Sequence, residues 1–411
     1  MNKQQINQAI WRACENLRGT VNPEQYQDYV LHYLMMKHKD GDNLDPLRLF
    51  MDDNIVDWER VGVDRIVKFI DDLSIVDDLD NDELGDIYEY MLQQFASSAG
   101  KKGGEFFTPP EVSQLLAMIL NPQPFDKCYD PTCGSGSLLL RLDKYTTSLE
   151  LYGQEINSRT FNICKWNMGI NDAKHYIKQG DTLRDPQFFY HNTNRLMQFD
   201  IIAANPPFSL NNWWGGGQDK WGRFHRGMPP KSKGDYAFIS HIIESLGAYG
   251  KAAIILPHGV LFRGSSEGAI RQSIIEENLI DAVIGLPPNL FYNTSIPTVV
   301  IVISRDREHK DVLFIDASSY FEQGKQQNKL ISPGKITETY SSRVVVDKFS
   351  YIATFEEIKD NSFNLNITRY VDTFEPEEPV NIRATQDEID ELETLLVEKR
   401  KQMNHILNDL I

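Results

Sequence analysis

The chain has 411 residues, 41% of them hydrophobic, and a formal net charge of −17, which together predict a globular protein of two or three domains. Its four cysteines include no CxxC pair, which argues against a zinc site or a disulfide framework, so we expect no metal and a reducing, cytoplasmic setting. The first residues do not form a signal peptide and no apolar run is long enough to span a bilayer, so we expect no membrane contact.

Residues 1–100 carry apolar side chains at helical spacing and almost no strand pattern. Ile6, Ile10 and Leu17 follow this spacing, and the run from Asn81 opens another helix. We therefore predict a helical N-terminal domain over 1–100, which serves either as a packing module or as a clamp on a partner or DNA. The Gly- and Ser-rich stretch 97–104 predicts a flexible joint after it.

Strand and helix patterns alternate from 101 to 371, which predicts an α/β domain with a mixed, mostly parallel sheet and helices on both faces. The predicted strands are 127–130, 151–155, 199–204, 251–257, 280–285, 297–303 and 312–316. The predicted helices are 110–120, 137–145, 157–168, 235–248 and 265–277. In such sheets ligands bind at the carboxyl ends of the strands.

A glycine-rich loop follows the first of these strands and precedes a helix. It runs from Asp130 through Gly134, Ser135 and Gly136. Glycines let a backbone approach a ligand closely, and the first turn of a helix offers N–H groups without helical partners. The loop is neither a phosphate loop nor the dinucleotide fingerprint, because the lysine of the former and the glycine spacing of the latter are absent.

Two acids follow the next strands. Glu155 ends the strand at 151–155, where a carboxylate binds ribose hydroxyls in nucleotide-binding sheets, and Asp181 follows Gly180 in a third loop, where it can accept from an adenine amino group. Each acid alone is also consistent with a solvated loop residue. The order of glycine loop, acid, Gly-Asp and the next motif favours a shared site.

The run Asn205-Pro206-Pro207-Phe208 directly follows the apolar strand 199–204. Prolines cannot continue a central strand, but they fix a rigid turn. The amide oxygen of Asn205 and the carbonyl of Pro206 can each accept one N–H of an exocyclic amine, while Phe208 stacks on the ring that carries it. An ordinary proline-rich turn is the alternative for the four residues taken alone.

With these motifs in place, the chain resembles S-adenosylmethionine-dependent methyltransferases that act on DNA adenine, and more closely the modification (M) subunits of type I restriction-modification systems. The resemblance also rests on the stretches 103–110, 257–263, 289–292 and 363–370. It implies a Rossmann-like methyltransferase domain over 101–371 that transfers a methyl group to the N6 amino group of a flipped-out adenine.

The resemblance implies S-adenosylmethionine as the cofactor. The segment before the helix at 110–120 would lie against its methionine end, and the glycine loop would cradle it. The cofactor-binding residues are then Glu105, Phe106, Phe107, Thr108, Pro109, Pro110, Asp130, Gly134, Ser135, Gly136, Glu155 and Asp181. The catalytic residues are Asn205, Pro206 and Phe208.

The net charge is awkward for a protein that holds double-stranded DNA, because duplex DNA is a polyanion. Residues 71–90 hold nine acids and no Lys or Arg, whereas the segment 220–233 holds five basic residues and no acid. We expect this basic segment to bind DNA, as a lid that orders on it, or else to be a solvated loop. Its basic residues are Lys220, Arg223, Arg226, Lys231 and Lys233.

A linker rich in Pro and acid covers 372–384, and a partner-binding helix is predicted over 385–411, with Thr385 and Glu388 as a candidate capping box. Apolar residues recur every seven positions at Ile389, Leu396 and Met403, which is typical of a coiled-coil seam. A helix packed on its own domain is the alternative.

The resemblance names the partners as a specificity (S) subunit, with two M chains per S, and a restriction (R) subunit. Three other functions stay open at this stage. They are a self-sufficient DNA adenine methyltransferase, a protein glutamine N-methyltransferase that uses the same Asn-Pro-Pro-aromatic turn, and a cofactor-binding scaffold without catalysis.

Overall fold

A nine-stranded sheet organises residues 127–353 in the computed structural model of the chain. The structure describes residues 3–17, 23–40, 63–74, 79, 81–98, 108–291, 294–325, 327–373 and 382–409. The sheet strands are β1 (Lys127–Asp130), β2 (Glu150–Glu155), β3 (His175–Gln179), β4 (Phe199–Ala204), β5 (Leu246–Pro257), β6 (Ile280–Gly285), β7 (Thr298–Ser304), β8 (Val312–Asp316) and β11 (Ser350–Ala353). The short strands β9 (Phe321–Glu322) and β10 (Lys329–Leu330) form a separate pair.

The strand order is β11-β8-β6-β7-β5-β4-β1-β2-β3. Strands β3, β2, β1, β4 and β5 are parallel to one another, whereas β7 runs antiparallel between β5 and β6, and β11 runs antiparallel to β8. The sheet is therefore mixed and mostly parallel, which confirms the predicted class. The sequence patterns missed β3, whose side chains alternate between half-buried and exposed at the edge of the sheet and so lack an apolar run.

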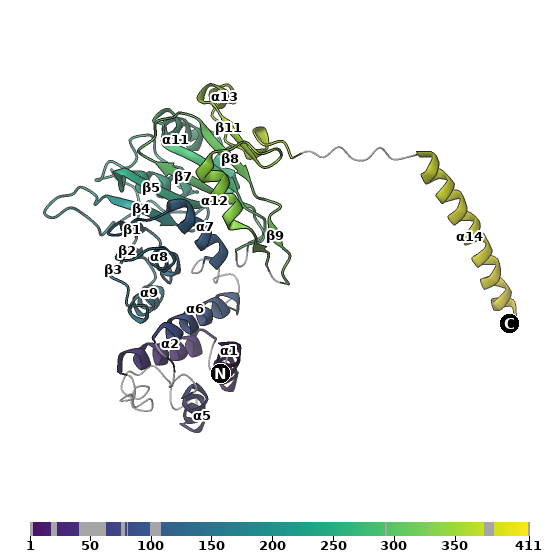
Figure 1. The fold of residues 1–411 in the computed structure, drawn as a ribbon, viewed down its shortest axis with the longest axis horizontal. Helices are drawn as coiled ribbons and strands as arrows, with labels where there is room; N and C mark the ends of the chain where they lie inside the picture. Colours follow the sequence, from purple (N-terminus) through teal and green to yellow (C-terminus); the bar gives the residue numbers. More distant parts are fainter. Residues whose placement is uncertain are drawn as a thin grey trace. The chain divides into compact units, whose positions relative to one another are not determined.

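Helices cover both faces of the sheet (Figure 1). They are α7 (Pro110–Leu120), α8 (Ser137–Asp143), α9 (Ser158–Ile170), α10 (Asp235–Glu244), α11 (Ser265–Glu276), α12 (Pro333–Ser342) and α13 (Phe355–Asp360), with 3-10 turns η4 (His258–Leu261) and η5 (Ile367–Arg369). In β5 the successive residues Ala252, Ala253, Ile254 and Ile255 alternate between two core clusters. One core packs under α7, α8 and α12 and the other under α10 and α11, because successive side chains of a strand point to opposite faces.

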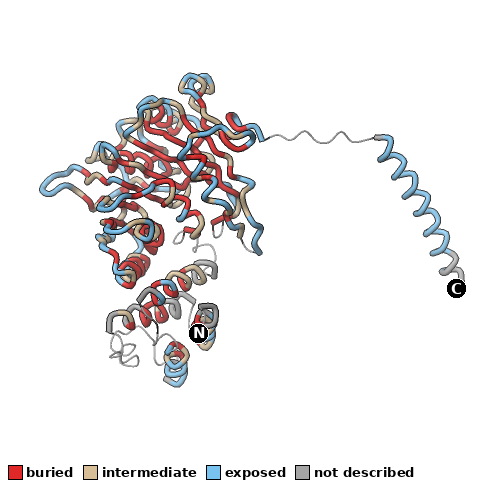
Figure 2. Tube along the Cα trace, viewed as in Figure 1, coloured by how far each residue is buried: buried red, intermediate tan, exposed pale blue. Residues whose placement is uncertain are grey.

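Figure 2 shows the buried residues concentrated along these strands and the helix faces against them. The central strands β6 and β7 are buried at every residue, as expected for strands covered on both faces. The helix predicted over 235–248 ends at Glu244, because the chain turns at Ser245 and enters β5 at Leu246.

The N-terminal helices are α1 (Lys3–Asn16), α2 (Pro23–Asp40), α5 (Val63–Leu73) and α6 (Asn81–Ser98). They form their own apolar cluster, which Ile163 and Ile170 of α9 complete. Ion pairs reinforce this contact: Asp28 of α2 lies 2.9 Å from Arg159, and Glu89 of α6 lies 3.1 Å from Arg141. The helical character of this region is confirmed, and its helices pack directly on α8 and α9.

The chain folds as two units, Met1–Val371 and Asp372–Ile411. The second contains the helix α14 (Ile382–Asp409), which confirms the predicted C-terminal helix. It begins at Ile382, so Thr385 lies inside its first turn and the predicted capping box does not mark its start. Among the described residues, no helix combines the length and the apolar character that crossing a bilayer requires.

Candidate functional site

The predicted site residues follow four neighbouring parallel strands. Strand β1 lies between β4 and β2, so the chain passes from β1 to β2 and β3 on one side and then returns to β4 on the other. Ligands of open α/β sheets bind at such a reversal of strand order, outside the carboxyl ends of the strands. Asp130 ends β1, Glu155 ends β2, Asp181 follows β3 and Asn205 follows β4. The sheet therefore places all four loops side by side at the carboxyl ends of these strands.

The glycine loop after β1 has a backbone that only glycine adopts without strain. Gly134 and Gly136 have positive φ angles of 54° and 81°. A Cβ on Gly136 would lie 2.5 Å from the terminal carbon of Met168 and 2.8 Å from the sulfur of Cys164. The carbonyl of Ser135 accepts a 3.0 Å hydrogen bond from the buried amide of Asn167. The loop is thus pressed against α9, with the start of α8 directly after it.

Glu155 ties the ends of β1 and β2 together. One carboxylate oxygen accepts the Gly134 N–H at 3.1 Å, and the other accepts the Asn157 N–H at 2.7 Å. The side chain is buried, so the carboxylate is oriented before any ligand arrives. This orientation suits a group that receives hydrogen bonds from the hydroxyls of a ribose.

Asp130 is buried at the end of β1 and accepts the Thr132 N–H at 2.9 Å. Burial raises the pKa of its carboxyl to about 7, the Thr132 N–H opposes the rise, and the charge of the nearby Glu155 adds to it. The two carboxylates thus lie close enough for the charge of Glu155 to disfavour ionisation of Asp130. A cationic ligand would relieve this repulsion, whereas an anionic one would increase it.

The loop after β3 is fastened to both neighbours. The Gly180 N–H donates to the carbonyl of Glu155 at 2.9 Å, and the Thr182 hydroxyl donates to the carbonyl of Pro131. One oxygen of Asp181 accepts the backbone N–H groups of Leu183 and Arg184. Asp181 therefore stands on a turn that is bonded to the loops carrying Glu155 and Asp130.

Asn205 contacts the segment before α7, 97 residues earlier in the chain. Its amide nitrogen donates a 3.1 Å hydrogen bond to the hydroxyl oxygen of Thr108, which is 6% exposed. Pro109 caps α7 and Pro110 is its first residue, so this contact joins the β4 turn to the start of α7. Because the nitrogen faces Thr108, the amide oxygen points away from it. Glu105, Phe106 and Phe107 lie outside the described residues.

Phe208 is half-buried and meets Phe291 edge-on, with ring centroids 5.9 Å apart. Two aromatic rings therefore border the turn that carries Asn205. The motif patterns did not assign a role to Phe291, and they also missed Ile156, an apolar side chain directly after Glu155 that is 64% exposed. The sequence shows only that an apolar residue follows the acid at the end of β2, whereas the exposure of its side chain becomes visible in the fold.

The basic segment 220–233 lies in a closed loop from Ser209 to Asp235. The Gly234 N–H donates to the carbonyl of Leu210, and the Asn212 N–H donates to that of Lys231, so the two ends of the loop run side by side. The buried ring of Trp213 packs in an apolar cluster with Leu183 from the segment after β3 and with Ala237 and Phe238 of α10. This packing attaches the loop to α10 and to the segment after β3.

Two of its five basic residues are not at the surface. The guanidinium of Arg223 is 0% exposed, pairs with Asp219 and donates to the carbonyls of Thr182 and Leu183. The side chain of Arg226 is 4% exposed and bridges Glu244 and Glu277. Lys220 and Lys231 are exposed, and Lys233 is half-buried. The expected DNA face is thus reduced to its lysines, because the two arginines are held by acids from within the protein.

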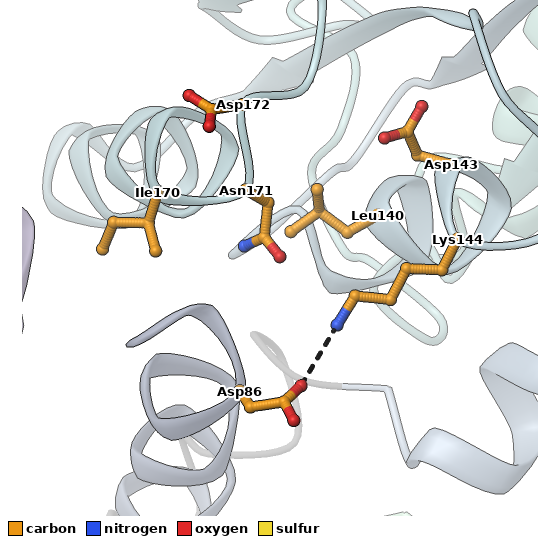
Figure 3. Close-up of a pocket in the computed structure, with 7 residues that line it drawn as sticks. All are labelled: Asp86, Leu140, Asp143, Lys144, Ile170, Asn171 and Asp172. Carbon is orange, nitrogen blue, oxygen red and sulfur yellow. Dashed lines mark ion pairs between the residues drawn. The ribbon is translucent and has the colours of Figure 1, made fainter. Parts of the chain in front are cut away.

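A polar cavity lies elsewhere, between the N-terminal helix α6 and the helices α8 and α9 of the sheet domain. The cavity has a volume of about 420 Å³. Figure 3 shows the side chains that line it, among which the Lys144 ammonium pairs with Asp86. The lining residues are Asp86, Leu140, Asp143, Lys144, Ile170, Asn171 and Asp172. None of them belongs to the predicted site, so the cavity marks the junction of α6 with α8 and α9.

The strand order and the four strand-end loops define a Rossmann-like domain of the methyltransferase class. The chain belongs to the N-6 DNA Methylase family, whose model matches residues 79–379. The crystal structure of the type I restriction-modification system methyltransferase subunit from Streptococcus thermophilus has a TM-score of 0.77 at 30% identity, covering 91% of this chain and 100% of that one.

Two curated relatives are similar over most of the chain. The Type I restriction enzyme MpnII methylase subunit of Mycoplasma pneumoniae is 37% identical over 353 residues, covering 80% of this chain and 64% of that protein. The Type I restriction enzyme HindI methylase subunit of Haemophilus influenzae is 32% identical over 320 residues, covering 72% of this chain and 70% of that protein. The chain thus spans roughly two thirds of the length of these relatives.

Proposed function

We propose that this chain transfers the methyl group of S-adenosylmethionine to the N6 amino group of an adenine in DNA. We further propose that it acts as the modification subunit of a type I restriction-modification complex. The observation that carries the proposal is the hydrogen bond from Asn205 to Thr108. It joins the turn expected to hold the amine to the segment expected to hold the methyl donor. Membership of the N-6 DNA Methylase family supports the same reaction.

The residues at the strand ends fit S-adenosylmethionine. The cofactor carries positive charge on its sulfonium and ammonium groups, and the buried pair Asp130 and Glu155 favours a cation. Glu155 is oriented to receive ribose hydroxyls, and the exposed Ile156 offers an apolar surface beside it for the adenine ring. The cofactor supplies an electrophilic methyl group, so the protein has no covalent intermediate to form.

The Asn205 turn would hold the target amine. An aromatic amine is a poor nucleophile because its lone pair is delocalised into the ring. When the Asn205 oxygen and the Pro206 carbonyl accept its two hydrogens, the nitrogen becomes pyramidal and its lone pair is aimed at the methyl group. This is catalysis by positioning and by fixed dipoles. The hydrogen bond from the Asn205 nitrogen to Thr108 keeps the oxygen end of the amide for this role.

The target base must leave the DNA stack to reach this turn, at a cost of a few kcal/mol. Stacking on Phe208 would offset part of that cost, since base–aromatic stacking contributes about 1–3 kcal/mol. The edge-on ring of Phe291 limits the positions that Phe208 can take. The aromatic pair would therefore present a fixed ring face to the flipped base.

A partner would supply most of the sequence reading. With a net charge of −17 and Arg223 and Arg226 paired internally, the chain alone is expected to bind duplex DNA weakly at physiological salt. Within its own unit, α14 exposes Ile389, Leu396 and Met403 at seven-residue spacing. We propose that this seam packs on the helices of a specificity subunit, with two modification chains per specificity subunit and a restriction subunit joining them.

The experiment that tests the function is methyl transfer from labelled S-adenosylmethionine to duplex DNA, with the chain alone and with a co-expressed specificity subunit. We expect N6-methyladenine at one defined sequence only when both are present. Removal of residues 385–411 should abolish complex formation while cofactor binding by the chain stays intact. Sequence-specific methylation by the solitary chain would contradict the subunit assignment, and label in protein rather than DNA would contradict the substrate.

A further inference from the structure

The turn that carries Asn205 ends in a backbone conformation that needs external support. Ser209 directly follows Phe208 and has a φ of 51°, in the left-handed region that residues with a side chain rarely occupy. Such a conformation is disfavoured by about 1–3 kcal/mol and persists only where surrounding contacts impose it. The contacts around Ser209 should therefore reveal what holds the turn in place.

A buried carboxylate provides that support. The Ser209 N–H donates to one oxygen of Asp235 at 2.7 Å, and the Ser209 hydroxyl lies 3.4 Å from the other oxygen. Asp235 is 1% exposed and is the first residue of α10, where the helix dipole also favours a negative charge. Ser209 and Asp235 thus close the 209–235 loop at the same point where the Asn205 turn ends.

Asp235 is itself held by a second pair of charges. Arg263 donates to Asp235 through one guanidinium nitrogen, and another lies 2.7 Å from a carboxylate oxygen of Glu267. Burial raises the pKa of Glu267, and the Arg263 charge opposes that rise. Arg263 comes from the segment after β5, the strand beside β4. The three charges therefore connect the end of the β4 turn to α10, to the segment after β5 and to the first turn of α11.

We propose that Asp235, held by Arg263 and Glu267, is a positioning residue that sets the orientation of the Asn205–Phe208 turn through the Ser209 N–H. This inference rests on the proposed methyl transfer and adds a residue that touches neither cofactor nor base. Asp235 acts through Ser209 on the turn, so its loss lowers turnover more than cofactor binding. A displacement of about 1 Å at reacting atoms lowers rates by about a hundredfold, so a small shift of the turn is enough.

Three variants weaken the contacts of Asp235 to different extents. Asp235→Ala removes the acceptor for both Ser209 and Arg263. Asp235→Asn keeps one acceptor oxygen, and its amide nitrogen then faces the donor of Arg263 or of Ser209, so one of the two contacts survives. Arg263→Lys keeps the positive charge but cannot bind Asp235 and Glu267 with one planar group. The expected order of turnover is wild type, then Arg263→Lys and Asp235→Asn, then Asp235→Ala.

The matched control is Asp281→Asn. Asp281 is also a buried acid paired with an arginine, since one oxygen lies 2.9 Å from Arg343, but it lies at the beginning of β6, away from the strand ends that carry the site. Its substitution should lower the free energy of unfolding without changing turnover per folded chain. A general loss of stability is thereby separated from a loss of position.

The assay uses the complex with its specificity subunit and duplex DNA. For Asp235→Ala we expect kcat to fall by about ten- to a hundredfold. The KM and the dissociation constant for S-adenosylmethionine should stay within about threefold, with one cofactor bound per chain. Wild-type kcat in folded Asp235→Ala would overturn the proposal, as would an equal fall in Asp281→Asn. If Asp235→Ala does not fold, Asp235→Asn and Arg263→Lys provide the same comparison.

Hydrogen exchange on the chain without DNA gives a readout that needs no activity. The Ser209 amide should exchange faster in Asp235→Ala than in wild type, together with its neighbours over 205–212, and Asp281→Asn should leave this segment unchanged. Unaltered exchange in Asp235→Ala would contradict the positioning role. Absence of methyl transfer by the wild-type complex would instead contradict the proposed function, and the exchange experiment would still decide whether Asp235 holds the turn.

Discussion

The strand-end loops and the basic segment 220–233 were both predicted from short sequence patterns, but the loops lie where we expected them and two of the basic side chains do not. The loops lie at the carboxyl ends of β1 to β4, as their order in the chain implied. In the basic segment, Arg223 and Arg226 are instead paired with acids of the protein. A motif that acts through its own backbone conformation can be recognised from a short stretch of sequence. The role of a charged side chain depends instead on which partners the fold places beside it.

The difference has a physical basis. Gly134 and Gly136 determine the path of their loop by their φ angles, and Glu155 reaches its partner Gly134 across one strand pairing. Arg223 has five N–H donors and is placed where carbonyls of another loop and the Asp219 carboxylate can accept them. A local run without acids therefore did not indicate free positive charge, because the acids that pair with Arg226 come from α10 and from the end of α11.

The first and largest effect should come from Arg223. Arg223→Met has a similar volume but removes the guanidinium that pairs with Asp219 and donates to the carbonyl of Leu183. Because this leaves a largely buried carboxylate without its counter-charge, we expect the free energy of unfolding to fall by about 3–5 kcal/mol. Lys220→Met, on the same segment but exposed, should change it by less than about 0.5 kcal/mol. Urea denaturation measures both. Equal midpoints would show that Arg223 is not internal and would remove the contrast between the two regions.

The second effect concerns the β4 turn. Asn205→Ala removes an acceptor used chiefly in the transition state, so turnover by the complex should fall about a hundredfold or more. The affinity for S-adenosylmethionine, measured by calorimetry, should barely move. Thr108→Val should have a smaller effect on turnover, because it removes the partner that orients the amide but not the amide itself. Near wild-type methylation by Asn205→Ala would refute the catalytic role.

Much of the fold could be predicted from the sequence because its strands are long apolar runs bounded by turn residues. The predicted strand 199–204 matches β4 residue for residue, and the run at 312–316 matches β8. The predicted helix at 110–120 matches α7, whose start Pro110 fixes. Edge strands such as β3 were missed because exposure on one face leaves no apolar run to recognise.

The site was harder to predict where it depends on contacts between distant segments. No local pattern links Thr108 to Asn205, because neither motif indicates the strand order that places α7 beside β4. The sequence pattern likewise identified Asp235 only as the start of a helix, because its hydrogen bond to Ser209 closes a loop of the whole length 209–235. Side chains that hold a motif in place therefore escaped the sequence patterns that located the motif.

A third prediction tests the acids of the strand-end loops. Glu155→Ala and Asp181→Ala should each weaken S-adenosylmethionine binding by about 1.5–3 kcal/mol, the range for hydrogen bonds to a charged group. Asp143→Ala, at the end of α8 and in the cavity of Figure 3, is the carboxylate control and should not change the affinity. Calorimetry with the isolated chain measures all three. Unchanged affinity in both Glu155→Ala and Asp181→Ala would contradict their assignment.

A fourth prediction uses the pKa of Asp130. Its folded value of about 7 lies above the value of about 3.9 in an unfolded chain, so the folded state binds this proton more tightly. The contribution to stability is therefore greatest below about pH 4 and is lost as the pH rises through 7. Asp130→Asn should flatten the dependence in this window and raise the free energy of unfolding at pH 8 by about 1 kcal/mol or more. It should also weaken cofactor binding, and unchanged stability at pH 8 would contradict the raised pKa.

The smallest effect should come from the lysines that remain at the surface of the basic segment. If Lys220 and Lys231 contact DNA phosphates, each Lys→Gln change should reduce the slope of log affinity against log salt for the complex by about 1, with a similar loss on all sequences. Arg226→Gln should leave the slope unchanged, because its guanidinium pairs with Glu244 and Glu277 and releases no counterion from DNA. An equal reduction of the slope in Arg226→Gln would mean that DNA draws this arginine away from its acids. The segment would then behave as the predicted lid that orders on DNA, and the contrast with the strand-end loops would hold only in the absence of DNA.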